Sequence, residues 1–233
     1  MQLTTEQINR LYEFTRQHYV EWYDLQTELV DHLANAIEKQ WLENPKIPFE
    51  DVLQLEFKKF GVFGFMDVVE KRQASLSKKY NMIIWKHFKD FFKLPQIIGT
   101  FLATYILSKI LSILFFDAIF PIIFLTGILI SIFFFSFTKR KINQQKKEDK
   151  KRWLFEEIIY SYGHFSGLLF IPLQIVNGAN IFNETIIEKP ILLLLVSFII
   201  VSYYLIMYVI IKIIPSKAEV YLKETYPEYE LVD

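Results

Sequence analysis

The chain has 233 residues, of which 52% are hydrophobic, and its mean hydropathy is +0.24. Basic and acidic side chains balance at 26 each, and there is no cysteine, which excludes disulfides, thiolate metal ligands and cysteine nucleophiles. The balance hides a strong segregation of charge. Residues 1–60 carry eleven acidic side chains against six basic ones, whereas residues 139–152 carry eight basic against two acidic.

Residues 1–80 are predicted to form a small helical domain. Thr4 and Gln7 fit a capping box at the start of a first helix. The apolar row of a second helix, at about 23–43, consists of Leu25, Leu29, Leu33, Ile37 and Trp41. Pro48 is expected as the first residue of a third helix, with Gly61 beyond its end. A fourth helix precedes a connector at 81–93, which the sequence leaves open as either a rigid helix or a loose linker.

The second helix also carries a polar face. Steps of four, three, four and three residues place on it Asp24, Glu28, Asp31, Asn35 and Glu38. Like charges at this spacing destabilise an isolated helix by about 0.2–0.5 kcal/mol per pair. Three interpretations stay open. The face, together with His32, is a docking surface for a basic partner, or Glu28, Asp31 and His32 form a metal site, or the face is solvated and lies opposite the core. The partner-binding face is the functional hypothesis, without a metal or cofactor.

The same helix carries a family resemblance. The run YDLQTELVDHLANAIE at 23–38, followed by FKKFG at 57–61, resembles the helical HTH-associated signalling (HAAS) and permease-prefix class of domains. The resemblance covers about 80 of the 233 residues. It implies a bacterial inner-membrane protein whose cytoplasmic domain relays between membrane helices and a partner, often a PadR-type transcriptional regulator. It implies no catalytic residues.

Four stretches within 94–214 are long and apolar enough to cross a bilayer, which takes roughly 20 residues of helix. They are 95–115, 118–138, 158–176 and 191–211. The third is the weakest, because two glycines and Pro172 dilute it. The predicted fold is therefore all-α, with a small cytoplasmic helical domain followed by a four-helix transmembrane bundle.

Basic residues predict the orientation of these spans. Lysines and arginines gather in the loop 139–152, before the first span and after the fourth, whereas the two other hairpins carry few. Basic loops stay in the cytoplasm, so both termini, including a tail at 215–233, are expected there. The basic loop is interpreted as topogenic charge, with an anionic-lipid or nucleic-acid patch as the alternative. Because its core lacks aromatic side chains on which bases could stack, no direct nucleic-acid binding is predicted.

Few polar groups lie inside the spans, and each is a candidate functional group. Lys109 could reach the outer membrane surface or pair with Asp117 without any chemistry. His164, close to Tyr160, is either a proton relay or a histidine that hydrogen-bonds to a neighbouring helix. The glycines of a small-xxx-small element, Gly163 and Gly167, suit close helix packing within the bundle or a homodimer seam.

The sequence contains no HExxH, G-x-S-x-G or phosphate-loop motif, so an enzyme is not expected. We therefore predict a membrane-anchored signalling or interaction protein whose cytoplasmic domain binds a protein partner. The alternative is a small transporter or permease accessory subunit, which needs polar groups that converge at the middle of the membrane.

Overall fold

The structure is a computed structural model of the chain, and it describes residues 2–113, 122, 125–134, 136, 140, 151–162 and 189–232. Most of these residues are helical and none is in a β-strand, which confirms the predicted all-α class. Two helices are long and apolar enough to cross a membrane, Gln96–Ile113 and Pro190–Ser216, and a shorter apolar helix spans Leu125–Phe134. Most of the predicted third span and much of the second lie outside the described residues.

The N-terminal helices are α1 (Thr5–Gln17), α2 (Tyr23–Glu43) and α3 (Phe49–Lys58). The capping box of α1 is present, because Thr4 accepts from the backbone N–H of Gln7 while the Gln7 side chain accepts from the backbone N–H of Thr4. The whole apolar row predicted for α2 is buried. Pro48 is the N-cap of α3 rather than its first residue, since its backbone is still extended, with ψ at 148°.

Helix α4 (Met66–Asp90) is 25 residues long and runs straight through the boundary predicted at residue 80. The connector predicted at 81–93 is therefore mainly the last part of a continuous helix. One face of this helix stays buried along its length, through Val69, Leu76, Tyr80, Ile84 and His87. The helix ends at Asp90, and a short turn leads into α5 (Gln96–Ile113).

The fourth predicted span, 191–211, is longer in the structure. It comprises α9 (Pro190–Tyr208), a π-helical turn η2 (Val209–Ile213) and α10 (Ile214–Ser216). Helix α5 packs along α9. Helix α7 (Leu154–Glu157) directly precedes the third predicted span, and a second π-helical turn, η1 (Ile158–Tyr162), is the described start of that span. Both π-helical turns pack against α4, which therefore contacts two of the predicted spans where they begin or end.

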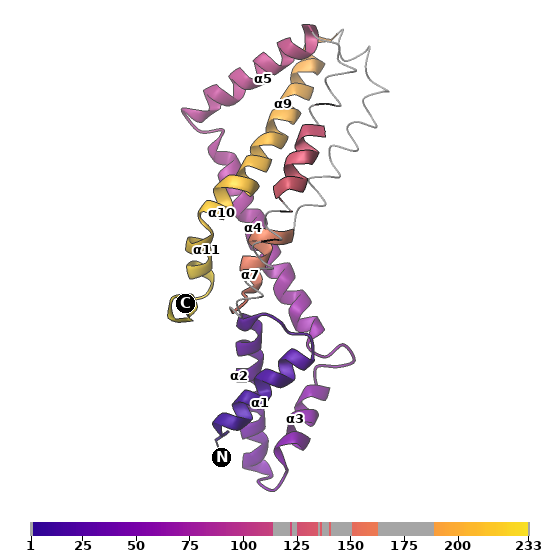
Figure 1. Cartoon of the computed structure of the whole chain (residues 1–233), viewed down its shortest axis with the longest axis vertical. Coiled ribbons are helices and arrows are strands. Elements are labelled where there is room, and N and C mark those ends of the chain that lie inside the picture. Colours follow the sequence, from indigo (N-terminus) through magenta and orange to yellow (C-terminus); the bar gives the residue numbers. More distant parts are fainter. Residues whose placement is uncertain are drawn as a thin grey trace.

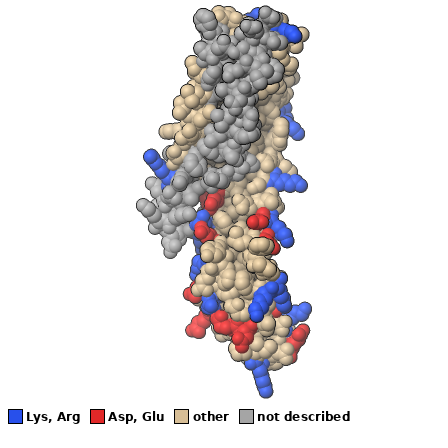
Figure 2. Space-filling view, turned by 90° about the vertical axis from the view of Figure 1, so that its right-hand side faces the viewer, with Lys and Arg blue, Asp and Glu red and all other residues tan. Residues whose placement is uncertain are grey.

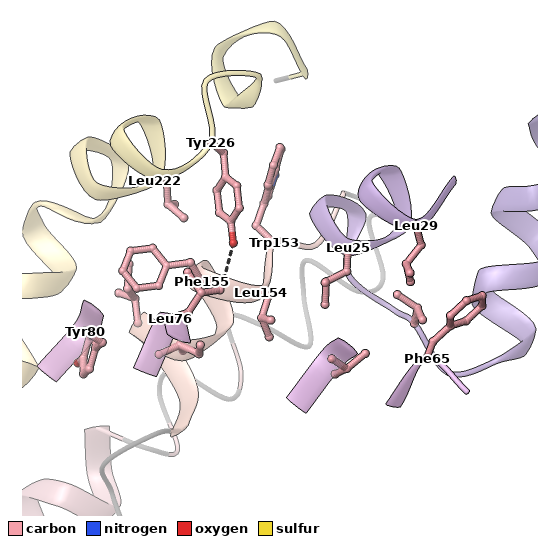
Figure 3. Packing of buried hydrophobic residues seen from close by; sticks show 14 of the residues in the cluster. Leu25, Leu29, Phe65, Leu76, Tyr80, Trp153, Leu154, Phe155, Leu222 and Tyr226 are labelled. Carbon is pink, nitrogen blue, oxygen red and sulfur yellow. Dashed lines mark hydrogen bonds between the residues drawn. The ribbon is translucent and has the colours of Figure 1, made fainter. Parts of the chain in front are cut away.

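The C-terminal segment forms α11 (Ala218–Thr225) and α12 (Tyr229–Val232). It is not a free tail, because Ala218, Leu222 and Tyr226 are buried in the same hydrophobic cluster as the N-terminal helices. That cluster also includes Trp153, Leu154, Phe155, Ile158 and Ile159. Figure 3 shows this meeting point, where side chains of α2, α4, the segment around Trp153 and the C-terminal helices converge.

The molecule is elongated, with its apolar helices gathered at one end (Figure 1). The N-terminal helices α1 to α3 lie at the opposite end, and α7 and α11 lie between the two. On the face seen in Figure 2, charged side chains are dense over the lower half, whereas the described part of the upper half is mainly uncharged.

Candidate interaction surface and the junction beside it

The polar face of α2 is divided by the fold into an exposed part and a buried end. Glu28, Asp31, His32 and Asn35 are exposed to solvent. Glu38 is half-buried, and its Oε1 accepts a hydrogen bond of 3.0 Å from the backbone N–H of Leu3. The exposed acidic face, defined here as Glu28, Asp31 and Asn35 with His32 at its border, is therefore the part of the predicted surface that a partner can reach.

Asp24 does not belong to this surface, which corrects the prediction that placed it there. Its side chain is only 7% exposed, and its Oδ1 accepts a hydrogen bond of 3.1 Å from the backbone N–H of Leu154. The physical reason is that Asp24 lies in the first turn of α2, where the segment 152–155 covers the helix. Helical spacing puts Asp24 in line with Glu28, but a segment 130 residues away buries it.

Burial raises the pKa of Asp24 above its usual value. The hydrogen bond from Leu154, the hydroxyl of Tyr226 and the positive charge of Arg72 each oppose that rise. The carboxyl group is thus held in a dry site whose polar neighbours favour its charged form without overcoming the loss of water. Burial and the nearby Asp24 carboxyl likewise raise the pKa of the Tyr226 hydroxyl.

Polar contacts attach the segment 152–157 to the start of α2. The backbone N–H of Tyr23 donates to the carbonyl oxygen of Arg152 at 2.7 Å, and the indole N–H of Trp22 donates to Glu157 at 2.9 Å. The Arg152 guanidinium forms ion pairs with Glu21 and with Glu157, the latter at 2.6 Å. The Arg152–Glu157 pair is better shielded from solvent than an ordinary surface ion pair, because the two side chains are 18% and 31% exposed, whereas Glu21 is 57% exposed.

Trp153 is the centre of the packing at this point. Its side chain is 2% exposed, and its ring lies 4.7 Å from the ring of Tyr226 and 5.3 Å from those of Tyr23 and Tyr229. Beside it, the backbone N–H of Phe155 donates to the Tyr226 hydroxyl at 3.2 Å (Figure 3). We call this meeting of the start of α2, residues 152–157 and the C-terminal helices the junction.

Two further contacts attach the C-terminal helices to α4. The Lys79 ammonium donates to the hydroxyl of Thr225 at 2.7 Å, and His87 Nε2 lies 2.6 Å from the hydroxyl of Tyr221. Burial is the main cause that lowers the pKa of His87. Helix α4 is thus held by the α11 side chains as well as by the core.

The metal interpretation of Glu28, Asp31 and His32 receives no support. Among the described residues, no group of three or more His, Asp or Glu side chains is placed to hold a metal ion. The His32 ring instead lies 5.8 Å from the ring of Phe60, edge to face. This face offers carboxylates and an amide to a partner, which suits a basic protein surface.

The other predicted site residues lie apart from the junction or outside the described residues. Lys109 is on the exposed side of α5, with its ammonium 5.5 Å from the centre of the Tyr105 ring. Tyr160 is in η1, half-buried against the hydrophobic cluster. His164, Gly163 and Gly167 lie outside the described residues, so the interpretations given to them stay predictions.

Sequence reasoning missed the junction. Its centre, Trp153-Leu154-Phe155, directly follows the basic loop, and an apolar triplet at the end of a hydrated loop is a signal that could have been noticed. The spacing of Ala218, Leu222 and Tyr226 by four residues is a second signal, because it is the apolar stripe of a helix. Neither signal shows which segments pair.

Comparison of the chain with protein-family models, with curated protein sequences and with solved structures finds no match.

Proposed function

We propose that the protein is a multi-pass membrane protein with four transmembrane helices, whose cytoplasmic helices form a signalling or interaction module that binds a basic protein partner. Its termini and the loop 139–152 lie in the cytoplasm. The junction between the N-terminal helices, α7 and the C-terminal helices connects this module to the spans. The partner-binding surface is the exposed acidic face of α2.

The main observation in favour of membrane insertion is that α5 buries mainly small polar side chains and exposes large apolar ones. Its buried positions are Thr100, Thr104, Ser108 and Leu111, three of which bear hydroxyl groups. Its exposed positions include large apolar side chains such as Phe101, Leu102, Ile106 and Ile110. A helix of a water-soluble protein places these classes the other way round. Small residues against a neighbouring helix and large apolar ones outside are typical of helices in lipid.

The extent of burial supports the same conclusion. Only 22% of the apolar window of α5 and 33% of that of Pro190–Ser216 is buried, whereas a core helix of a soluble protein is mostly buried. Hydroxyl groups in these helices donate hydrogen bonds to backbone carbonyl oxygens of the same helix. Thr104 donates to the carbonyl oxygen of Thr100 at 2.9 Å, and Ser197 donates to that of Leu193 at 2.8 Å. In lipid, such internal bonds avoid the cost of an unpaired polar group.

The arrangement of the chain supports the proposed orientation. The N-terminal helices, the segment 151–157 and the C-terminal helices all lie on the same side of the apolar helices (Figure 1). This is the grouping that an even number of spans with a cytoplasmic loop 139–152 requires. Direct contact between Asp24 and Leu154, and between Phe155 and Tyr226, ties the three segments together on that side.

The proposed signalling role rests on the continuity of helix α4. Helix α4 leads without interruption from the N-terminal helices to the turn before α5, and both π-helical turns pack on it. A displacement of the spans can therefore reach the module through a rigid helix. The exposed acidic face lies on α2, which contacts α3 and α7.

The proposed topology is tested with single cysteines, which the cysteine-free chain makes possible without further changes. The exposed side chains of Lys39, Glu224 and Lys189 are replaced one at a time by cysteine and treated with a membrane-impermeant maleimide in intact spheroplasts. We expect labelling of Lys189→Cys alone, and labelling of the other two only after permeabilisation. Equal labelling of all three in intact cells would overturn the proposed topology.

The proposed partner surface is tested on the full chain in mild detergent. Bait carrying Glu28→Lys and Asp31→Lys is compared with native bait and with a matched control, Glu13→Lys and Glu70→Lys, whose glutamates are also exposed. We expect a defined partner to be recovered with native and control bait and lost with the α2 variant. A partner that binds all three baits equally excludes the acidic face as its docking site.

The transporter alternative gains no support from the described residues. Lys109 faces outward over Tyr105 rather than toward α9, and His164 lies outside the described residues. The interaction role is therefore the function that the structure supports best.

A further inference from the structure

The last part of α4 has two faces of different character. Tyr80, Ile84 and His87 turn inward to the core. The opposite face carries Met82, Trp85, Lys86 and Lys89, which line an open groove of about 710 Å³ together with Lys93 from the turn after the helix. A volume in this range suits a small molecule or a lipid headgroup.

The apolar members of this groove are exposed to an unusual degree. Met82 is 58% exposed and Trp85 57%, although tryptophan is normally well buried in a folded protein. The Trp85 ring lies edge-on to Phe88, with the ring centres 5.4 Å apart, so it is held in place by its own helix. Trp85 precedes α5 by eleven residues, and an exposed tryptophan near the end of an apolar helix is typical of the membrane–water interface.

The charge of the groove is positive. Lys86 and Lys89 are exposed with no acidic partner among the described residues, while Lys93 pairs with Asp90 at 2.7 Å. Asp90 therefore offsets one lysine, and the surroundings keep a net positive charge.

The groove lies next to the first apolar helix. Lys93 lies three residues before α5, whose exposed side is apolar. Lysines next to a span carry long apolar stems that lie along the acyl region, with the ammonium among the headgroups. A tryptophan with lysines at this level combines an apolar anchor with charges that attract anionic lipid.

We propose that Trp85, Lys86, Lys89 and Lys93 form a binding site for the phosphate headgroup of an anionic phospholipid in the cytoplasmic leaflet. The inference rests on the proposed membrane insertion and extends it. Lys86 and Lys89 contact the phosphate, and Lys93 adds charge from the turn before α5. Trp85, one residue before Lys86, lies beside the same lipid at the membrane–water interface. Because the opposite face of α4 holds the junction, lipid bound here sets the depth of the helix that carries the signal.

The site is tested with the full chain in nanodiscs of phosphatidylcholine. The discs contain a small fraction of a brominated lipid, either phosphatidylglycerol or phosphatidylcholine, with the bromine near the carboxyl end of the acyl chains in both cases. Bromine quenches nearby tryptophan fluorescence, and the signal lost in Trp85→Phe isolates Trp85 from the three other tryptophans. We expect quenching by the brominated phosphatidylglycerol to be about fivefold or more stronger than by the brominated phosphatidylcholine at equal fraction. Added salt of about 0.5 M is expected to reduce this preference, because the Debye length falls below 5 Å.

The triple variant Lys86→Gln, Lys89→Gln, Lys93→Gln is expected to abolish the preference. The matched variant Lys39→Gln, Lys46→Gln, Lys58→Gln removes three exposed lysines from α2, α3 and the loop between them and is expected to retain the preference. Circular dichroism checks that both variants keep the helical content of the native chain.

Three results would overturn the proposal: equal quenching by the two brominated lipids, a preference that survives the triple variant, or a change in Trp85 emission caused by soluble glycerol phosphate in discs without anionic lipid. The last identifies a free phosphate as the ligand. Flotation of the protein with vesicles of phosphatidylcholine alone tests membrane insertion without the lipid site. It therefore distinguishes a wrong lipid site from a wrong proposal of a membrane protein. Protein that floats but shows no preference is a membrane protein without this site.

Discussion

Replacing Trp153 with alanine tests how strongly the junction holds its three segments together. The indole is 2% exposed and is surrounded by three tyrosine rings. Removal of a buried tryptophan costs about 3–5 kcal/mol, from the lost burial of apolar surface and from the cavity that remains. Since 1.36 kcal/mol corresponds to a tenfold change in an equilibrium, opening of the junction is expected to become at least about 100-fold more frequent.

Hydrogen exchange of the full chain in detergent, measured by mass spectrometry, gives the exchange rate of each peptide and so reports where the junction opens. We expect faster exchange in the peptides that cover 152–157 and 218–226, while α3 and α5 keep their native rates. Trp153→Phe is expected to have a smaller effect. The indole N–H has no hydrogen-bond partner among the described residues, so this change removes ring volume but no bond.

Trp41→Ala is the matched control, because Trp41 is also buried, at the far end of α2, where its ring lies near that of Phe49. It is expected to loosen α2 and α3 and to leave the C-terminal helices protected. Native exchange of 218–226 in Trp153→Ala, or equal acceleration of that segment by both variants, would refute the role assigned to the junction.

Two further predictions concern single positions. The pKa of Asp24 is raised in the folded protein, so folding takes up a proton and stability falls as pH rises from about 3.8 through the folded pKa. Asp24→Asn is expected to lose this dependence of junction opening on pH. Asp24→Ala leaves the N–H of Leu154 unpaired and is expected to lower the free energy of opening the junction by about 1–3 kcal/mol at every pH. A pH profile of Asp24→Asn that parallels the native one would contradict this assignment. Gly64→Ala is expected to be more destabilising in thermal unfolding than Gly61→Ala: both glycines have positive φ, but a Cβ at Gly64 meets the Phe57 ring at 2.8 Å, whereas one at Gly61 meets open space. Equal losses at the two positions would show that the close approach to Phe57 has no influence.

The sequence by itself determined the features that depend on neighbouring residues. The capping box of α1 and the buried row of α2 follow from spacings of three and four residues, because a helix brings such neighbours onto one face. The apolar stretches at 95–115 and 191–211 correspond to the helices Gln96–Ile113 and Pro190–Ser216, since length and hydropathy are properties of the segment alone.

Only the tertiary structure decided what depends on distant segments. Asp24 and Glu28 are equivalent by helical spacing, yet one is buried beneath Leu154 and the other is exposed, because burial is set by whatever covers a face and not by the helix itself. For the same reason, residues 1–80 end inside a continuous helix, and the C-terminal residues complete a core that begins at the N-terminus. Helical periodicity specifies which side chains share a face, whereas contacts between residues 130 apart depend on the path of the whole chain.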